Sequence, residues 1–237
     1  KIMDFFSSSS YFKAGLDPAN LVTSLSVIYD LEKPIDFARQ VYEILADNGI
    51  WHFEQSYMPT MLRMNAYDTV CHEHLEYYSL KVVKELLEKC DMKIIDVQMN
   101  DINGGSFAVT ACKDTNTSVK VNDAVINWLI DEEYKMGLHT IKPYYEFAQR
   151  AYEHRDSIVN LVKSLRADGK TIYGYGASTK GNTLLQYYGL TNKEIPYAAE
   201  RTKTKWGKYT VGSGVKILSE EDARKMNPDY FFVMPYG

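Results

Sequence analysis

The chain has 237 residues, enough for one large domain or two modest ones that each bury a core. Its hydrophobic content of 45%, charged content of 24% and net charge of −4 are ordinary for a globular protein and provide no electrostatic footprint for nucleic acid or an anionic membrane. Three widely spaced cysteines, no run of transmembrane length and no signal peptide predict a cytoplasmic protein without a disulfide framework.

The N-terminal part of the sequence predicts a βαβ unit. Lys1–Met3 is expected to end a strand, and residues 21–29 are expected to form a buried strand because this apolar run has no helical period. A helix is predicted from Pro34, with Gly49 as its left-handed cap. Residues 50–57 follow as the next strand, so the two strands should be parallel neighbours.

The next elements predict how this sheet ends. Residues 80–91 carry a helical apolar stripe, and residues 92–101 and 104–114 predict two strands joined by a glycine turn, hence an antiparallel pair. A parallel sheet that finishes with an antiparallel hairpin is the closing half of a class I S-adenosylmethionine methyltransferase, although many α/β domains carry an antiparallel edge. Long helical patterns occupy residues 119–167.

A second α/β unit begins at Lys170 with a strand, a glycine-rich turn and a helix that starts near Ser178. Backbone N–H groups at such a helix start bind anions, and Lys180 adds a point charge. The G-x-G-A-x-x-x-G spacing departs from the dinucleotide and P-loop patterns, so the turn is either a phosphate site or merely a tight joint. Residues 198–214 form a basic, aromatic loop that is either solvated or faces a nucleotide diphosphate. The predicted domains are therefore residues 1–113, connecting helices at 114–168, and residues 169–237.

The densest cluster of groups able to move protons near neutral pH lies at residues 71–79. His72 and His74, two of only five histidines, flank Glu73, and two tyrosines follow. If the segment is extended, both imidazoles share one face. Acid/base chemistry is the favoured interpretation, and partly buried structural histidines are the main alternative. A metal site would need further ligands that the spacing does not provide, so no metal is predicted.

Three stretches together resemble the nucleotide-sugar C-methyltransferases: CHEHLEYYSL at 71–80, YGYGASTKGNTLLQYYG at 173–189 and ERTKTKWGKYTVGSG at 200–214. These S-adenosylmethionine enzymes methylate a ring carbon of a dTDP- or similarly activated 4-keto-deoxysugar, and the similarity extends across essentially the whole chain. The resemblance implies an α/β fold: the C-terminal half of a class I methyltransferase Rossmann-like sheet, plus a second Rossmann-like domain that helps to hold the nucleotide sugar. It also implies that the chain starts near the third strand of that sheet and ends early. The family's zinc-binding N-terminal domain and glycine-rich cofactor loop then have no counterpart here.

The resemblance further implies that His74 is the general base, with Glu73 beside it. Cys71 stands where some relatives carry tyrosine, and Asp30 matches an active-site histidine of others. In this mechanism the base forms an enolate that attacks the sulfonium methyl, so no metal is needed. The expected catalytic residues are His74, Glu73, His72 and Tyr77, and the expected cofactor-binding residues are Asp4, Phe5 and Ser26. The expected substrate-binding residues are Cys71, Tyr78, Tyr175, Gly176, Ala177, Lys180, Asn182, Glu200, Arg201 and Lys205.

Two alternatives stay open. One is a noncatalytic nucleotide-sugar-binding fragment, because half of the cofactor site is missing from the sequence. The other is an NAD(P)-dependent sugar oxidoreductase that uses the turn at residues 174–181, although no acidic residue is expected at the end of a following strand to support it. The expected partner is a nucleotide-linked sugar, with no nucleic acid or membrane, and the expected assembly is a monomer or small homo-oligomer.

Overall fold

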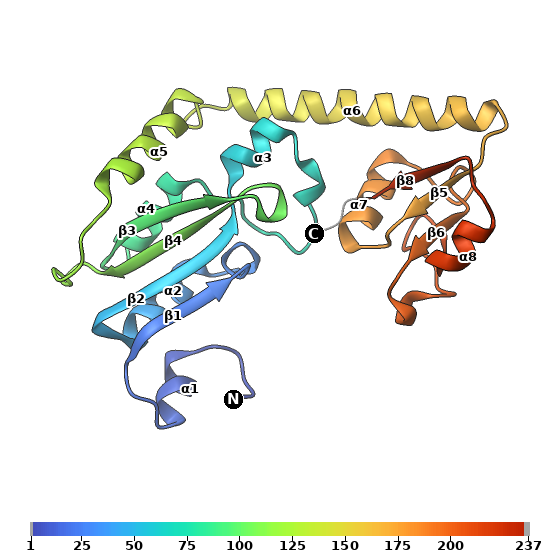
Figure 1. The fold of residues 1–237 in the computed structure, drawn as a ribbon. Helices are drawn as coiled ribbons and strands as arrows, with labels where there is room; N and C mark the ends of the chain where they lie inside the picture. Colours follow the sequence, from blue (N-terminus) through green and yellow to red (C-terminus); the bar gives the residue numbers. More distant parts are fainter. Residues whose placement is uncertain (1, 235–237) are drawn as a thin grey trace. The chain divides into compact units, whose positions relative to one another are not determined.

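The computed structural model describes residues 2–234 and divides the chain into two compact units (Figure 1). The first unit comprises residues 1–64 and 72–144, and the second comprises residues 65–71 and 145–237. These units differ from the predicted division at residues 113 and 168, because residues 114–144 pack with the first unit and residues 145–168 with the second. The second unit also includes the short segment 65–71, which directly precedes the histidine cluster.

The first unit is built on a four-stranded mixed sheet. Its strands are β1 (Ala19–Leu25), β2 (Leu45–Ser56), β3 (Met92–Asn100) and β4 (Ser106–Lys113), in the spatial order β1-β2-β4-β3. The pair β1/β2 is parallel, whereas β4 runs antiparallel to both β2 and β3. The predicted βαβ unit and antiparallel hairpin are thus confirmed, and the sheet has the parallel start and antiparallel end that the sequence pattern predicts.

Three helices cover one face of this sheet: α2 (Pro34–Ile44), α4 (Leu80–Glu88) and α5 (Asp123–Lys135). Alternate residues of β2 point into the core beneath them, including Trp51 and Phe53, and Tyr57 directly after the strand continues this row. The shorter helices of this unit are α1 (Ser8–Lys13), α3 (Met58–Met64) and the 3₁₀ turns Ile28–Asp30 and Ile102–Gly104. Because β-branched and aromatic residues fill the pleated face and apolar stripes fill the helices, the core follows the sequence pattern closely.

Two local predictions in this unit are wrong. Gly49 does not cap a helix, because α2 ends at Ile44 and the chain enters β2 at once. A Cβ on Gly49 would lie 2.6 Å from the carbonyl oxygen of Ala19, so the residue is glycine to allow close approach of two backbones. Ile2 and Met3 form no strand, and Lys1 lies outside the described residues.

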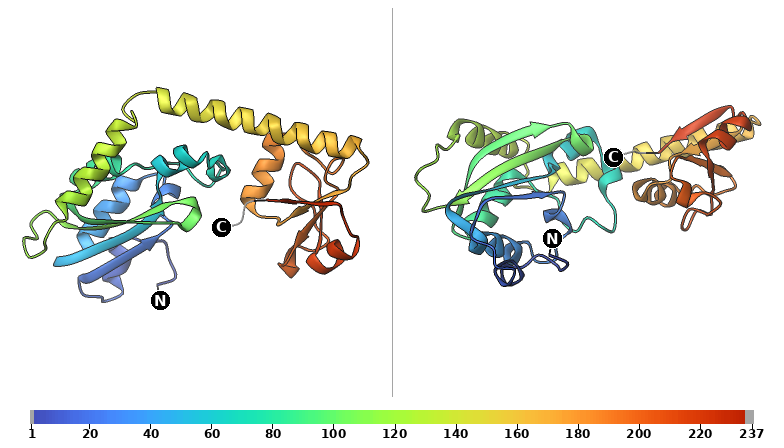
Figure 2. Two further views of the ribbon diagram at one scale, coloured as in Figure 1. Left: turned by 45° about the horizontal axis from the view of Figure 1, so that its top comes forward. Right: turned by 60° about the horizontal axis from the view of Figure 1, so that its bottom comes forward.

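The second unit is a parallel sheet with helices around it. Its strands are β5 (Ile172–Tyr175), β6 (Tyr197–Glu200), β7 (Lys216–Ser219) and β8 (Tyr230–Val233), in the order β7-β6-β5-β8. Its helices are α6 (Lys142–Ala167, residues 142–144 of which belong to the first unit), α7 (Thr179–Tyr188) and α8 (Glu220–Lys225), with 3₁₀ turns at Tyr67–Thr69 and Lys203–Lys205. Figure 2 shows α6 as one continuous helix. The strand order reverses direction between β5 and β8, and such a switch point is where open α/β sheets bind ligands.

Candidate functional site

The histidine cluster lies at the carboxyl ends of β1 and β2. The backbone N–H groups of Leu75 and Glu76 both donate to the carbonyl oxygen of Tyr29, at 2.9 and 3.1 Å. Further along, the carbonyl oxygen of Tyr78 accepts from the N–H of Met58 at 3.0 Å, and a parallel bridge joins Tyr57 to Tyr78. The segment therefore continues the sheet past the end of β1, on the edge where ligands bind in α/β folds.

His74 is half-buried in a small polar and aromatic cluster. Its ring centroid lies 4.5 Å from that of Tyr29 and 6.5 Å from that of Tyr77. Asp30 is close enough to interact electrostatically with both His74 and Glu73: burial raises the pKa of Asp30, the attraction of His74 opposes the rise, and Glu73 adds to it. The structure thus places two of the four expected catalytic residues, His74 and Glu73, near Asp30, and a third, Tyr77, beside His74.

The other expected residues of the histidine cluster differ in exposure: His72 is exposed to solvent, whereas Tyr78 is buried. His72 and Glu73 form a turn and are exposed, so the two imidazoles do not share the face of a strand. Tyr78 is only 4% exposed, and its hydroxyl has no hydrogen-bond partner among residues 2–234. Burial, with a smaller contribution from Glu76, raises the pKa of Tyr78 to about 12. Tyr78 therefore keeps its proton at neutral pH and is a hydrogen-bond donor.

A buried carboxylate that the sequence analysis missed holds the end of this segment in place. Glu133 of α5 is 2% exposed and accepts hydrogen bonds from the N–H groups of Leu80 at 2.5 Å and Lys81 at 3.0 Å. It also accepts one from the hydroxyl of Tyr57 at 2.8 Å. Since the first N–H groups of a helix lack partners within the helix, Glu133 satisfies two of them at the start of α4. In sequence, Glu133 is one of several acids on α5, and only its burial distinguishes it.

Of the three residues expected to bind the cofactor, Asp4 and Phe5 lie together and Ser26 does not. Asp4 and Phe5 line a cavity of about 210 Å³. The carboxylate of Asp4 accepts from the N–H of Phe5 at 2.8 Å and from the hydroxyl of Ser10 at 3.1 Å, and the Phe5 ring is 94% exposed. Ser26 does not line this cavity; it follows β1 in the left-handed region, with φ +56°. An exposed ring beside a small cavity fits a planar group such as an adenine, but not a whole cofactor.

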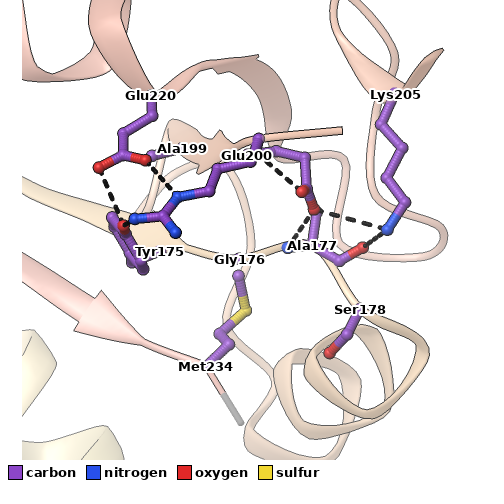
Figure 3. A pocket seen from close by; sticks show the side chains of 10 residues that line it. Tyr175, Gly176, Ala177, Ser178, Ala199, Glu200, Lys205, Glu220 and Met234 are labelled. Atoms are coloured by element: carbon purple, nitrogen blue, oxygen red, sulfur yellow. Dashed lines mark hydrogen bonds and ion pairs between the residues drawn. The ribbon is translucent and has the colours of Figure 1, made fainter. Parts of the chain in front are cut away.

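The second unit contains a larger cavity, of about 510 Å³, at its switch point (Figure 3). It lies at the carboxyl ends of β5, β6 and β8. Its lining residues are Tyr175, Gly176, Ala177, Ser178, Ala199, Glu200, Arg201, Lys205, Glu220 and Met234. Six of the ten residues expected to bind substrate are therefore in one place, although they come from two stretches of sequence more than twenty residues apart.

Glu200 ties the glycine-rich turn to the basic loop. Its carboxylate accepts from the N–H groups of Ala177 at 3.0 Å, Arg201 at 2.8 Å and Thr202 at 2.9 Å. Lys205 donates to the carbonyl oxygen of Ala177 at 2.9 Å and lies 3.5 Å from the carboxylate. Burial alone would raise the pKa of Glu200, but these hydrogen bonds and Lys205 together lower it. The expectation that no acidic residue ends a strand after the glycine-rich turn is wrong. The next strand along the chain, β6, ends at Glu200.

A second group of charges lies on the other side of the cavity, around Glu220. Arg201 donates to this carboxylate at 2.7 Å and to the hydroxyl oxygen of Tyr175 at 3.1 Å, and Tyr175 donates to Glu220 at 2.9 Å. Arg224 donates to Glu220 through Nε at 2.9 Å and through Nη2 at 2.8 Å. Arg201, Arg224 and Tyr175 lower the pKa of Glu220 to about 2. Glu220 and Arg224 were not expected from the sequence.

Four residues expected to bind substrate do not line this cavity: Tyr78, which is buried in the first unit, and Lys180, Asn182 and Cys71. Lys180 and Asn182 lie in the first turn of α7, which Ser178 caps by accepting from the N–H of Gly181 at 3.1 Å. The side-chain oxygen of Asn182 is buried without a partner in the part of the chain that the structure describes. Cys71 is half-buried at the end of segment 65–71.

Within the second unit, Tyr67 joins segment 65–71 to α6 and α7. Its hydroxyl lies 2.6 Å from Nδ1 of His154 and 2.7 Å from the hydroxyl of Tyr188.

Residues 2–234 contain neither a helix long and apolar enough to cross a membrane nor a group of three side chains suited to hold a metal ion.

Comparison with known proteins gives a family match. Residues 101–237 match the family model described as the C-methyltransferase C-terminal domain. The chain is also 37% identical over 197 residues to the C-methyltransferase NovU of Streptomyces niveus, an alignment that covers 83% of this chain and 46% of the relative. The chain thus spans about half the length of the curated relative that it matches.

Solved structures of methyltransferases match parts of the chain at low similarity. Mitomycin 7-O-methyltransferase MmcR is 14% identical, with a TM-score of 0.34, and the match covers 44% of this chain and 32% of that one. Magnesium protoporphyrin IX methyltransferase from Synechocystis PCC 6803, with bound SAH, is 12% identical, with a TM-score of 0.33, over 42% of this chain and 48% of that one.

Proposed function

Because this chain belongs to the C-methyltransferase family, we propose that the full-length protein transfers a methyl group from S-adenosylmethionine to a ring carbon of a nucleotide-activated 4-keto-deoxysugar. The observation that carries this proposal is the position of His74, half-buried at the carboxyl ends of two parallel strands, with Asp30 and Tyr29 beside it. Glu73 and Tyr77 complete this group, to which the sequence resemblance also assigns acid/base chemistry.

His74 acts as the base in this proposal. A proton on the carbon next to a ketone is acidic because its loss leaves an enolate, and a positioned imidazole removes it. The nearby carboxylate of Asp30 then stabilises the positive charge that the ring acquires. Tyr77, whose ring lies beside that of His74, would supply the donor for the enolate oxygen, because the hydroxyl of Tyr78 is buried in the core.

The cofactor would be held in part by Asp4 and Phe5. The exposed ring of Phe5 offers a stacking surface for adenine, next to a carboxylate that accepts hydrogen bonds. When bound, the cofactor would supply a methyl group on a positively charged sulfur: the carbon nucleophile would take the methyl group, and the sulfur would leave as a neutral thioether.

The cavity of the second unit would hold the nucleotide. It lies at a switch point, and Gly176, with φ +90°, allows close backbone approach at the start of α7. The guanidinium group of Arg201 lines this cavity and suits a diphosphate. A nucleotide sugar bound here would present its sugar beyond the diphosphate.

The test is a base-deletion variant of the full-length protein. We expect His74→Asn to lower methyl transfer to a dTDP-4-keto-deoxysugar at least about 100-fold, the usual contribution of a general base, without changing dTDP affinity. Hydrogen exchange at the carbon next to the ketone, followed in D₂O with S-adenosylhomocysteine present, should fall in parallel. His139→Asn is the matched control, because His139 stacks on Tyr134 in the turn after α5. Exchange and transfer that both persist in His74→Asn would rule out His74 as the base.

A second candidate is nucleotide-sugar binding without turnover. The observation in its favour is that the nucleotide cavity is fully built, whereas Ser26 lies outside the small cavity next to Asp4. Isothermal titration separates the two candidates. Binding of both S-adenosylhomocysteine and dTDP supports the enzyme, and binding of dTDP alone supports the binding module.

A further inference from the structure

Arg201 is the least constrained cation in the cavity of the second unit. Its side chain is 80% exposed and donates hydrogen bonds to Glu220 and Tyr175. Lys205, in contrast, joins the turn carbonyl of Ala177 to Glu200 and so holds two loops together. Arg201 can therefore change partners without disturbing the fold, whereas Lys205 cannot.

The single negative charge of Glu220 is paired with two arginines, Arg201 and Arg224. One of its oxygens accepts from Arg201, while the other accepts from both Nε and Nη2 of Arg224 and from the hydroxyl of Tyr175. Arg224 is four residues further along α8 and does not line the cavity. When Arg201 leaves, Glu220 keeps a double hydrogen bond to an arginine and one to a tyrosine.

The charges that line the cavity are balanced. Glu200 and Glu220 face Arg201 and Lys205, so an incoming diphosphate meets no unpaired cation among the lining residues. A dianion gains little from such a site unless one cation exchanges its partner. Release of Arg201 leaves Glu220 paired with a second cation, Arg224, whereas release of Lys205 would leave Glu200 with backbone N–H partners but no cation.

We infer that Glu220 is an internal counter-ion that competes with the substrate diphosphate for Arg201, and that Arg224 takes over Glu220 when Arg201 turns to the ligand. This inference rests on the proposed function, in which the cavity holds a nucleotide diphosphate. It assigns roles to two residues outside the expected site: Glu220 weakens diphosphate binding and Arg224 strengthens it.

The inference predicts changes of opposite sign in two variants of the full-length protein. We expect Glu220→Gln to tighten dTDP binding about threefold to fivefold, and Arg224→Met to weaken it by a similar factor, the usual worth of an exposed ion pair. The adjacent pair Glu221 and Lys225 lies on the same helix with the same spacing, and neither residue lines the cavity. Glu221→Gln and Lys225→Met are therefore matched controls, with shifts below about twofold expected because exposed charges further away are screened.

Isothermal titration with dTDP at one fixed ionic strength measures these affinities, and inorganic pyrophosphate as a second probe should give the same order. In an Arg201→Met background, Glu220→Gln should lose its effect, which separates competition for Arg201 from general electrostatics. Arg224→Lys keeps the charge and should stay near wild type, so it replaces Arg224→Met if that variant does not fold.

The outcomes separate the inference from the proposed function. Weaker binding in Glu220→Gln would show that Glu220 orients Arg201 rather than competing for it, and would overturn the inference alone. Equal shifts in the Glu221 and Lys225 controls would do the same. Absence of dTDP binding in both the wild type and Glu220→Gln would refute the nucleotide site and the inference together.

Discussion

Replacing Glu133 by glutamine should strongly destabilise the first unit. The two side chains have nearly the same shape, so packing is conserved and the hydrogen bonds decide the result. Oε1 of Glu133 accepts from Tyr57 and Leu80, and Oε2 accepts from Lys81. An amide keeps the acceptor at one position but places an NH₂ group against the N–H of Lys81 at the other.

The magnitude follows from these three contacts. A hydrogen bond to a charged acceptor contributes about 1.5–3 kcal/mol, a neutral one contributes about 0.5–1.5 kcal/mol, and a buried donor without a partner costs about 1–3 kcal/mol. Two bonds weakened from charged to neutral and one bond lost add up to about 3–5 kcal/mol. The loss is centred on the start of α4, immediately after the segment that contains His74.

Urea unfolding followed by tryptophan fluorescence measures this loss, because Trp51 lies in the core of the first unit and reports its unfolding. Glu132→Gln is the matched control, since Glu132 is a partly exposed neighbour on the same helix, paired with Lys135. We expect the control to stay within about 0.5 kcal/mol of wild type. A Glu133→Gln protein as stable as this control would refute the account of Glu133 as the anchor of α4.

Three further perturbations test other parts of the fold. Gly49→Ala should cost about 1–3 kcal/mol in urea unfolding, because the added Cβ would lie 2.6 Å from a carbonyl oxygen of β1; an unchanged midpoint would contradict this. Asp229 has a pKa lowered from 3.8 to about 2 by hydrogen bonds from the N–H and hydroxyl of Thr171 and by Lys170. Its stabilisation is therefore present above about pH 4 and lost as the pH falls through 2, so wild type and Asp229→Asn should converge in thermal stability over that window. Tyr67→Phe removes the partner of the buried Tyr188 hydroxyl and should cost about 1–3 kcal/mol in thermal unfolding, with no loss expected if water replaces it.

The parts of the fold that local patterns specify were predicted well. The hairpin β3–β4 follows from two β-rich runs separated by Asn103, Gly104 and Gly105, which take the positive φ values that such a turn requires. The glycine-rich turn before α7 and its Ser178 cap follow from equally local signals. Such patterns are decided by residues that are neighbours in sequence, so sequence reasoning can find them.

Sequence-based predictions failed or stayed open where the role of a residue depends on a partner that is distant in sequence. Gly49 looks like a helix cap in sequence, but its requirement comes from the backbone of Ala19 on another strand. Glu200 was expected to bind substrate, in a loop that the sequence leaves either solvated or facing a diphosphate, and only the pairing of β6 with β5 places its carboxylate on the turn at Ala177. Glu220 and Glu133 give no signal in sequence for the same reason.

The sequence by itself determined the two α/β patterns, the histidine cluster with its acid and tyrosines, and six of the residues that line the cavity of the second unit. Only the tertiary structure decided which charges meet: Glu220 with Arg201 and Arg224 and Glu200 with Lys205 in the second unit, and Asp30 with His74 in the first. The physical reason is that hydrophobic periodicity and turn chemistry act over a few residues, whereas ion pairs and buried hydrogen bonds depend on which strand ends the fold brings side by side.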